Sequence, residues 1–116
     1  MPLEQLAQLT PDLWVGPQLQ AGDFEAIAAK GFRTVINARP DREAPDQPSS
    51  DALAVAAAKA GLTYEYLPVV PNQITENEVV KFEQHLAALP KPILAFCRTG
   101  NRCSQLYSMV KARAAR

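Results

Sequence analysis

Short apolar runs alternate with helical stretches along the whole chain, and this alternation constrains its fold more than any other feature. The run Thr34-Val35-Ile36-Asn37, for example, is rich in β-branched residues and follows a helix that Gly31 ends. The predicted strands are 13–15, 34–37, 63–67 and 93–96, and the predicted helices are 23–30, 51–60, 75–89 and 103–114. Such an alternation indicates an α/β fold, with a mostly parallel sheet of four or five strands flanked by helices.

Size and charge narrow the kind of protein further. The 116 residues fit one domain that covers 1–116, and 12 basic side chains balance 12 acidic ones. We therefore expect neither nucleic acid nor a membrane as a partner. The first residues lack the basic and apolar regions of a secretion signal, so we expect a cytoplasmic protein. Its two cysteines and one histidine have no metal-ligand spacing, and we expect no metal or other cofactor.

The segment 97–102, Cys-Arg-Thr-Gly-Asn-Arg, carries most of the chemical information. It lies between a predicted strand and a predicted helix, where a tight loop turns backbone N–H groups inward beside the helix N-terminus. This arrangement binds anions and lowers the pKa of a cysteine thiol. We predict that Cys97 is a nucleophile, that Arg102 and Arg98 bind the anion, and that the backbone N–H groups of residues 98–102, those of 99–101 among them, contribute donors.

The segment also admits a simpler interpretation, in which Cys97 is only a small buried side chain. Two arginines beside such a cysteine favour the nucleophile, because they need an anion. The donors that we predict from residues 99–101 are the N–H groups of Thr99, Gly100 and Asn101.

The spacing within the loop separates two enzyme classes. Cysteine-dependent phosphatases have Cys-x5-Arg, whereas here Arg102 lies one position earlier, which makes the pattern Cys-x4-Arg. That pattern resembles the active loop of rhodanese-type sulfurtransferases, which carry sulfur as a cysteine persulfide.

The rest of the chain resembles a different family. Residues 9–18 and 31–37 look like the opening of dual-specificity phosphatases. Together with Asn37-Ala38-Arg39-Pro40-Asp41 and the cysteine loop, they resemble the phosphatase-like domain of bacterial beta-lactamase-hydrolase-like proteins. The resemblance implies a phosphatase-like fold. It leaves the reaction open, because members have been labelled phosphatase and sulfur transferase. Some are fused to a persulfide-oxidising domain, so we expect functional pairing with such an enzyme.

The sequence offers a weak choice of general acid. A phosphatase protonates its leaving oxygen, usually from an aspartate, but residues 68–73 contain no acid. Asp41, Glu43 and Asp46 in the loop after residue 37 are substitutes, of which we name Asp41, although a solvated loop charge is the more common role of each. Arg39 is a structural or rim residue that adds positive potential, and Asn37 either donates to the anion or satisfies local backbone.

Cys103 follows the loop directly. Burial as a small apolar residue is the leading interpretation, and a resolving thiol for an oxidised or persulfidated Cys97 is the alternative.

Sulfur transfer tolerates a missing acid, because the leaving sulfite or thiolate is a stable anion. The sequence therefore favours a sulfurtransferase that moves sulfane sulfur from thiosulfate or a persulfide, through Cys97, to a thiol acceptor. The alternatives are a phosphatase that works through phospho-Cys97 with Asp41 as acid, and a non-catalytic anion-binding or redox-sensing module.

Overall fold

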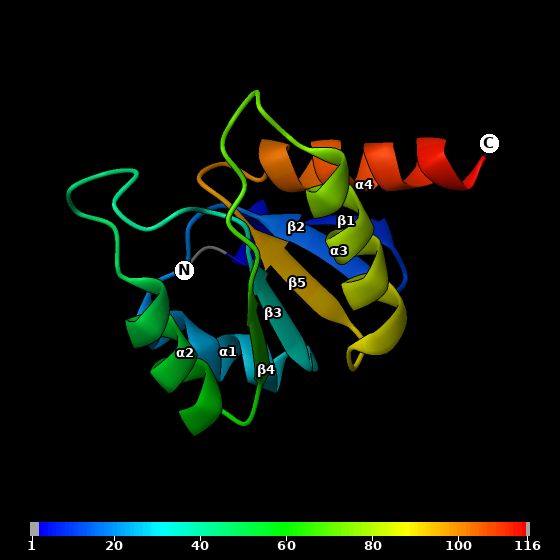
Figure 1. The fold of residues 1–116 in the computed structure, drawn as a ribbon. Helices are drawn as coiled ribbons and strands as arrows, with labels where there is room; N and C mark the ends of the chain where they lie inside the picture. The colour runs from blue at the N-terminus through cyan, green and yellow to red at the C-terminus, as the bar shows by residue number, and fades with distance from the viewer. Residues whose placement is uncertain (1–2, 116) are drawn as a thin grey trace.

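A five-stranded sheet forms the centre of the computed structural model, which describes residues 3–115 (Figure 1). The strands are β1 (Ala7–Thr10), β2 (Leu13–Gly16), β3 (Thr34–Asn37), β4 (Thr63–Tyr66) and β5 (Ile93–Phe96). Their spatial order is β1-β2-β5-β3-β4. β2, β3, β4 and β5 run parallel, and only β1 is antiparallel to its neighbour. The prediction of a mostly parallel α/β sheet is confirmed.

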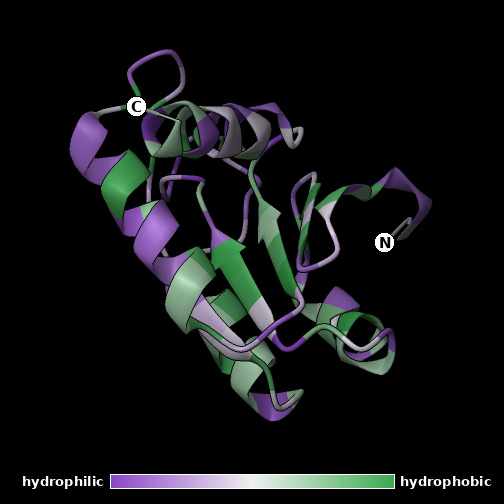
Figure 2. Cartoon of the chain, turned by 90° about the vertical axis from the view of Figure 1, so that its right-hand side faces the viewer, coloured by the Kyte–Doolittle hydropathy of each residue, from purple (hydrophilic) through white to green (hydrophobic). Residues whose placement is uncertain are grey.

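Helices cover both faces of this sheet. They are α1 (Phe24–Ala29), α2 (Ser50–Lys59), α3 (Glu76–Ala88) and α4 (Asn101–Ala114), with short 3₁₀ turns at Leu3–Gln5 and Ala21–Asp23. α1 and α2 pack on one face around Phe24 and Leu53. α3 and α4 pack on the other around Phe82 and Leu106. In Figure 2 the central strands are coloured as apolar, as expected for strands buried on both faces.

The ends of the helices follow local signals in the sequence. Ser49 caps α2 by accepting from the Ala52 N–H, and Thr75 and Glu78 form a capping box at the start of α3, the helix predicted over 75–89. α4 begins two residues earlier than predicted, because Gly100 serves as its cap with a left-handed φ of 98°. The loop and the helix start therefore overlap, and Arg102 belongs to the first turn of the helix.

The edge strand β1 was not predicted from the sequence. Its four residues are exposed or half-buried, and they pair with β2 through an irregular register between Gln8 and Thr10. A strand of this kind is held by its neighbour rather than by its own apolar pattern. Within residues 3–115 no helix is both long and apolar enough to cross a membrane.

Candidate active site

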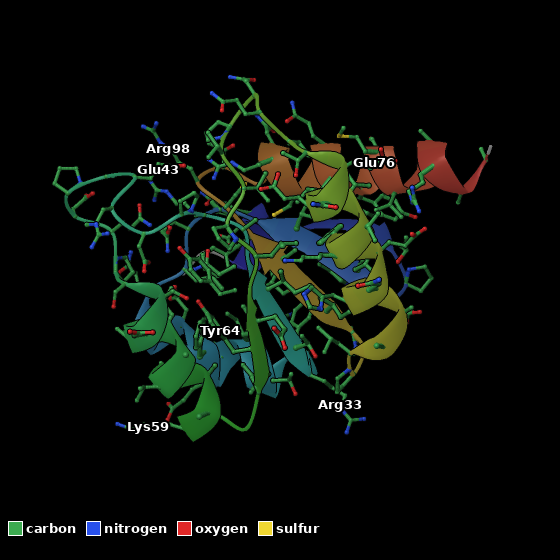
Figure 3. All side chains as sticks on the ribbon, in the orientation of Figure 1. Arg33, Glu43, Lys59, Tyr64, Glu76 and Arg98 are labelled. Carbon is green, nitrogen blue, oxygen red and sulfur yellow. The ribbon has the colours of Figure 1, made fainter. Side chains whose placement is uncertain are left out.

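Three loops meet at the carboxyl ends of the parallel strands, as their topology predicts. The loop after β5 supplies Cys97 and Arg98, the loop after β3 supplies Glu43, and the loop after β4 supplies Pro71 and Asn72. They enclose a pocket of about 350 Å³ that reaches Cys97. Figure 3 places Arg98 and Glu43 next to each other at this end of the molecule.

Cys97 lies at the base of this pocket and is 1% exposed. Its Sγ accepts a hydrogen bond of 3.1 Å from the Gly100 N–H. The Cys103 thiol gives the strongest support to the thiolate, and the backbone N–H groups of Cys103, Thr99 and Gly100 add to it against the cost of burial. Together they lower the pKa of the Cys97 thiol from the usual 9.0 to about 5. Cys97 is therefore a thiolate at neutral pH.

Cys103 is fully buried on the first turn of α4. Its hydrogen bond to Cys97 and its burial raise the pKa of its own thiol well above the usual value. The two cysteines are thus unequal. Cys97 carries the negative charge, and Cys103 remains a thiol whose S–H donates a hydrogen bond to Cys97. Neither of the two cysteines forms a disulfide in this structure.

Arg102 is almost completely buried, and its guanidinium is held in place by the protein. Nη1 donates to the carbonyl oxygens of Val69 at 3.0 Å and Ala38 at 3.4 Å, and Nη2 donates to Glu43 Oε1 at 3.0 Å. Its Nε is the one buried side-chain nitrogen or oxygen within residues 3–115 that lacks a hydrogen-bond partner. A buried donor of this kind is costly unless a ligand satisfies it.

Glu43 joins two arginines at the mouth of the pocket. The same Oε1 accepts from Arg102 Nη2 and from Arg39 Nε at 2.9 Å. Partial burial raises the pKa of Glu43, but the hydrogen bonds and charges of Arg102 and Arg39 outweigh it and lower that pKa below 4.5. Glu43 is therefore ionised at neutral pH and is poorly suited to give up a proton.

Asp41 lies away from the reacting thiol. Its Oδ1 accepts from the Ser50 N–H at 2.7 Å, at the N-terminus of α2, and its own N–H donates to the Tyr66 hydroxyl. It is not among the residues that line the Cys97 pocket. The structure therefore places Asp41 as an anchor of the loop on α2 and not beside Cys97.

Arg39 and Asn37 support the loop from behind the pocket and do not line it. Arg39 is buried, and its guanidinium donates from Nε to Glu43 Oε1 and from Nη1 to Gln18 Oε1. The Asn37 side chain accepts from the Arg39 backbone N–H at 2.8 Å and donates to the Tyr64 hydroxyl at 3.0 Å. The role that the structure gives Asn37 is thus the satisfaction of local groups.

The structure brings most of the other loop residues to the pocket. Arg98, Thr99, Asn101 and Arg102 line the pocket, while Gly100 contributes its backbone N–H from below. Arg98 is exposed at the rim. Four pocket residues were not predicted from the sequence to bind the anion: Glu43, which was considered only as a substitute acid, and Pro71, Asn72 and Gln105.

Of these four, Gln105 had a detectable signal, because it lies three residues after Arg102 on one helix. The other three come from loops whose positions depend on tertiary contacts. Among the described residues there is no cluster of three His, Cys, Asp or Glu side chains that could hold a metal ion.

The sequence matches known families over most of its length. Residues 5–114 match the family model of the phosphatase-like domain of beta-lactamase hydrolase-like proteins. A beta-lactamase hydrolase-like protein of Xylella fastidiosa is 34% identical over 105 residues, and one of Agrobacterium fabrum is 38% identical over 100. These matches cover 90% and 86% of the chain. They cover only 24% and 23% of the relatives, so the chain spans about a quarter of their length.

Solved structures agree with this match. A candidate phosphatase of Neisseria meningitidis is 37% identical and superposes with a TM-score of 0.85, over 91% of this chain and 75% of that one. A candidate phosphatase of Shewanella putrefaciens has a TM-score of 0.81 at 22% identity, over 96% and 69%. The core catalytic domain of a PP-IP phosphatase of S. cerevisiae superposes with a TM-score of 0.67 at 13% identity. The match covers 86% of this chain and 59% of that one. The last two show a shared fold alone.

Proposed function

Since the chain belongs to the phosphatase-like domains of beta-lactamase hydrolase-like proteins, we propose that it is a cysteine-dependent phosphatase acting on phosphomonoesters. The observation that carries the proposal is the unpartnered, buried Nε of Arg102, a residue that lines the same pocket as the Cys97 thiolate. A phosphoryl oxygen would give this donor its missing acceptor, and arginine binds phosphate through two parallel N–H groups. The family and the Neisseria structure support the same assignment.

The proposed reaction has two steps at one sulfur. The Cys97 thiolate attacks phosphorus, the bond from phosphorus to the ester oxygen breaks, and the leaving group departs with the electron pair. Water then attacks the phosphocysteine, orthophosphate leaves, and the thiolate is restored. Arg102 and the N–H groups of the loop hold the phosphoryl oxygens, and the N-terminus of α4 stabilises their charge.

The pocket restricts which esters can react quickly. Its one carboxylate, Glu43, is held ionised by two arginines, and Asp41 is engaged on α2. No lining residue therefore stands ready to protonate a leaving oxygen. We propose that the best substrates have acidic leaving groups, such as phenols, that depart as anions.

A series of aryl phosphates tests this proposal. The value of kcat/KM should fall steeply as the phenol becomes less acidic, and Cys97→Ser should abolish turnover throughout. A flat dependence on phenol acidity would contradict the absence of an acid. Hydrolysis that survives in Cys97→Ser would contradict the nucleophile itself.

Sulfur transfer is the second candidate, and a specific observation favours it. The loop is one residue shorter than the phosphatase pattern, and the absence of a ready acid costs sulfur transfer nothing. The Cys97 thiolate would attack the outer sulfur of thiosulfate, the S–S bond would break, and sulfite would leave with the electron pair. A thiol acceptor, as its thiolate, would then take that sulfur from the persulfide and restore Cys97.

The comparisons support phosphate chemistry better than sulfur chemistry, since the matched family is described as phosphatase-like and the Neisseria structure as a candidate phosphatase. One preparation can be assayed for both reactions: phosphate release from an aryl phosphate, and thiocyanate release from thiosulfate and cyanide. Phosphate release that depends on Cys97 supports the first proposal. Thiocyanate release that depends on Cys97, without phosphate release, would replace it with the second.

A further inference from the structure

A second hollow continues from the Cys97 pocket along α4. It encloses about 660 Å³ and is lined by Asn72, Ile74, Asn101, Ser104, Gln105, Ser108 and Met109. Three of these residues, Asn72, Asn101 and Gln105, also line the Cys97 pocket, so the two spaces share a wall. We refer to this second hollow as the α4 groove. Its volume is in the range that small organic ligands occupy.

The wall of the groove is built from two segments. Residues 101, 104, 105 and 108 are spaced as one face of a helix, and residues 72 and 74 come from the loop before α3. Figure 1 shows this loop rising beside the first turns of α4. Because a helix rises by about 1.5 Å per residue, the groove extends about 10 Å from Asn101 to Ser108.

The chemistry of the wall is unusual for an exposed helix face. None of the described residues that line the groove is charged, whereas exposed faces of helices are normally rich in charge. The amide side chains of Asn72, Asn101 and Gln105 lie at the wall shared with the Cys97 pocket. The apolar side chains of Ile74 and of Met109, which is 41% exposed, line the groove alone. The groove therefore offers hydrogen bonds first and an apolar contact second.

We propose that the α4 groove binds the leaving group of the substrate, and that this group is uncharged, elongated and apolar at its far end. The inference rests on the proposed phosphatase function, because Cys97 and Arg102 would hold the phosphoryl group at the shared end. A leaving group that carries further phosphates does not suit the groove, since no cation among the lining residues could pair with them. The assignment gives a specificity role to residues that take no part in the chemistry.

Two aryl phosphates of different length probe the groove. Phenyl phosphate and 4-biphenylyl phosphate have phenols of similar acidity, but only the biphenylyl group is long enough to approach Met109. The wild-type protein should prefer 4-biphenylyl phosphate in kcat/KM. Met109→Glu should reduce this preference by about five- to tenfold, because a charge replaces the apolar contact.

The variant leaves the catalytic pocket intact, since Met109 lines the groove but not the space around Cys97. Val55→Glu is the matched control, because Val55 is 56% exposed on α2 and an apolar side chain is again replaced by a carboxylate. It should keep the wild-type preference. An equal preference in the wild type and Met109→Glu, or no preference in the wild type, would overturn the inference while leaving the phosphatase proposal standing.

If neither ester is hydrolysed, nor an aryl phosphate with a more acidic phenol, the phosphatase proposal fails, and binding decides the groove by itself. Calorimetry with Cys97→Ser should then show tighter binding of 4-biphenylyl phosphate than of phenyl phosphate, and Met109→Glu in that background should remove the difference. Equal affinities of the two esters for Cys97→Ser would overturn the groove assignment.

Discussion

At the scale of single residues, the site depends on an unequal pair of thiols. Cys103 has no exposed surface and stays protonated. Its S–H donates a hydrogen bond to Cys97, and this bond stabilises the Cys97 thiolate. The sequence left Cys103 between a packing residue and a resolving thiol. Its hydrogen bond to Cys97 adds a role in setting the charge of Cys97.

Replacing Cys103 tests that role. In the wild type, alkylation of Cys97 by iodoacetamide should be half-maximal near pH 5, where its thiol ionises. Cys103→Ala removes the largest contribution to the lowered pKa, so the midpoint should move up by about one pH unit or more. Cys103→Ser keeps an O–H donor and should recover part of the shift. An unchanged midpoint in Cys103→Ala would show that Cys103 only fills space.

Glu43 is the counter-charge for two buried arginines, and its loss should be felt in stability. Glu43→Gln should lower the free energy of unfolding at neutral pH by about 1–3 kcal/mol, because Arg39 and Arg102 lose their shared anion. The pKa of Glu43 is lower in the folded chain than its usual 4.5. The stabilisation is therefore complete above that value and is lost as the pH falls through the lowered pKa.

Denaturant unfolding of the wild type and Glu43→Gln at several pH values checks this prediction. Their difference should be greatest near neutral pH and should shrink below about pH 4.5. The exposed Glu25 supplies the control variant, Glu25→Gln, which should behave like the wild type. A difference between wild type and Glu43→Gln that persists unchanged into acid would contradict the ion-pair account.

At the scale of elements, the start of α4 joins the cradle to the helix. Gly100 has a φ of 98° and donates its N–H to Cys97, so its left-handed conformation serves the site directly. Gly100→Ala should cost about 1–2 kcal/mol of stability, because an L-residue is strained there. It should also raise the pKa of Cys97 as the N–H turns away.

Gly31 separates the two effects of that substitution. It has a similar φ of 101°, at the end of α1 and away from the loop, and a Cβ there would meet no atom within 4 Å. Gly31→Ala should lose comparable stability while Cys97 keeps its wild-type alkylation profile. Equal profiles for Gly100→Ala and Gly31→Ala would contradict the role of the Gly100 N–H.

The contact between Asp41 and the first turn of α2 indicates that Asp41 has a structural role. Because its carboxylate accepts from the Ser50 N–H, Asp41→Asn should lower stability by about 1 kcal/mol and leave kcat/KM for aryl phosphates unchanged. A general acid would instead lose about 100-fold or more on esters with poorly acidic phenols. Such a loss in steady-state kinetics would restore Asp41 to the reaction.

At the scale of the whole molecule, the sequence predicts the helices and strands that have a local apolar pattern. It does not predict features that depend on contacts between distant segments. The apolar strand Ile93–Phe96 and the helix predicted over 75–89, which the structure places at Glu76–Ala88, were visible in the local pattern. The edge strand β1 was not, because its residues are barely buried. Glu43 and Asn72 reach Cys97 through loops whose paths only the folded chain defines.

The chemistry was predicted less well than the fold. Sulfur transfer was the first expectation, since the loop is short and no acid follows β4. The matched family and the Neisseria structure fit the phosphatase alternative better, and the buried Arg102 Nε is compatible with that. Local spacing could not resolve the question, because both reactions use a thiolate in an anion cradle.

The central claim is that Cys97 forms a phosphorylated intermediate. The most direct test is rapid acid quenching of the protein during turnover of an aryl phosphate, followed by intact mass spectrometry. We expect a species heavier by one phosphoryl group that is absent in Cys97→Ser. No phosphoryl adduct on the wild-type protein, together with added sulfur on Cys97 after exposure to thiosulfate, would contradict the claim and identify sulfur as the transferred group.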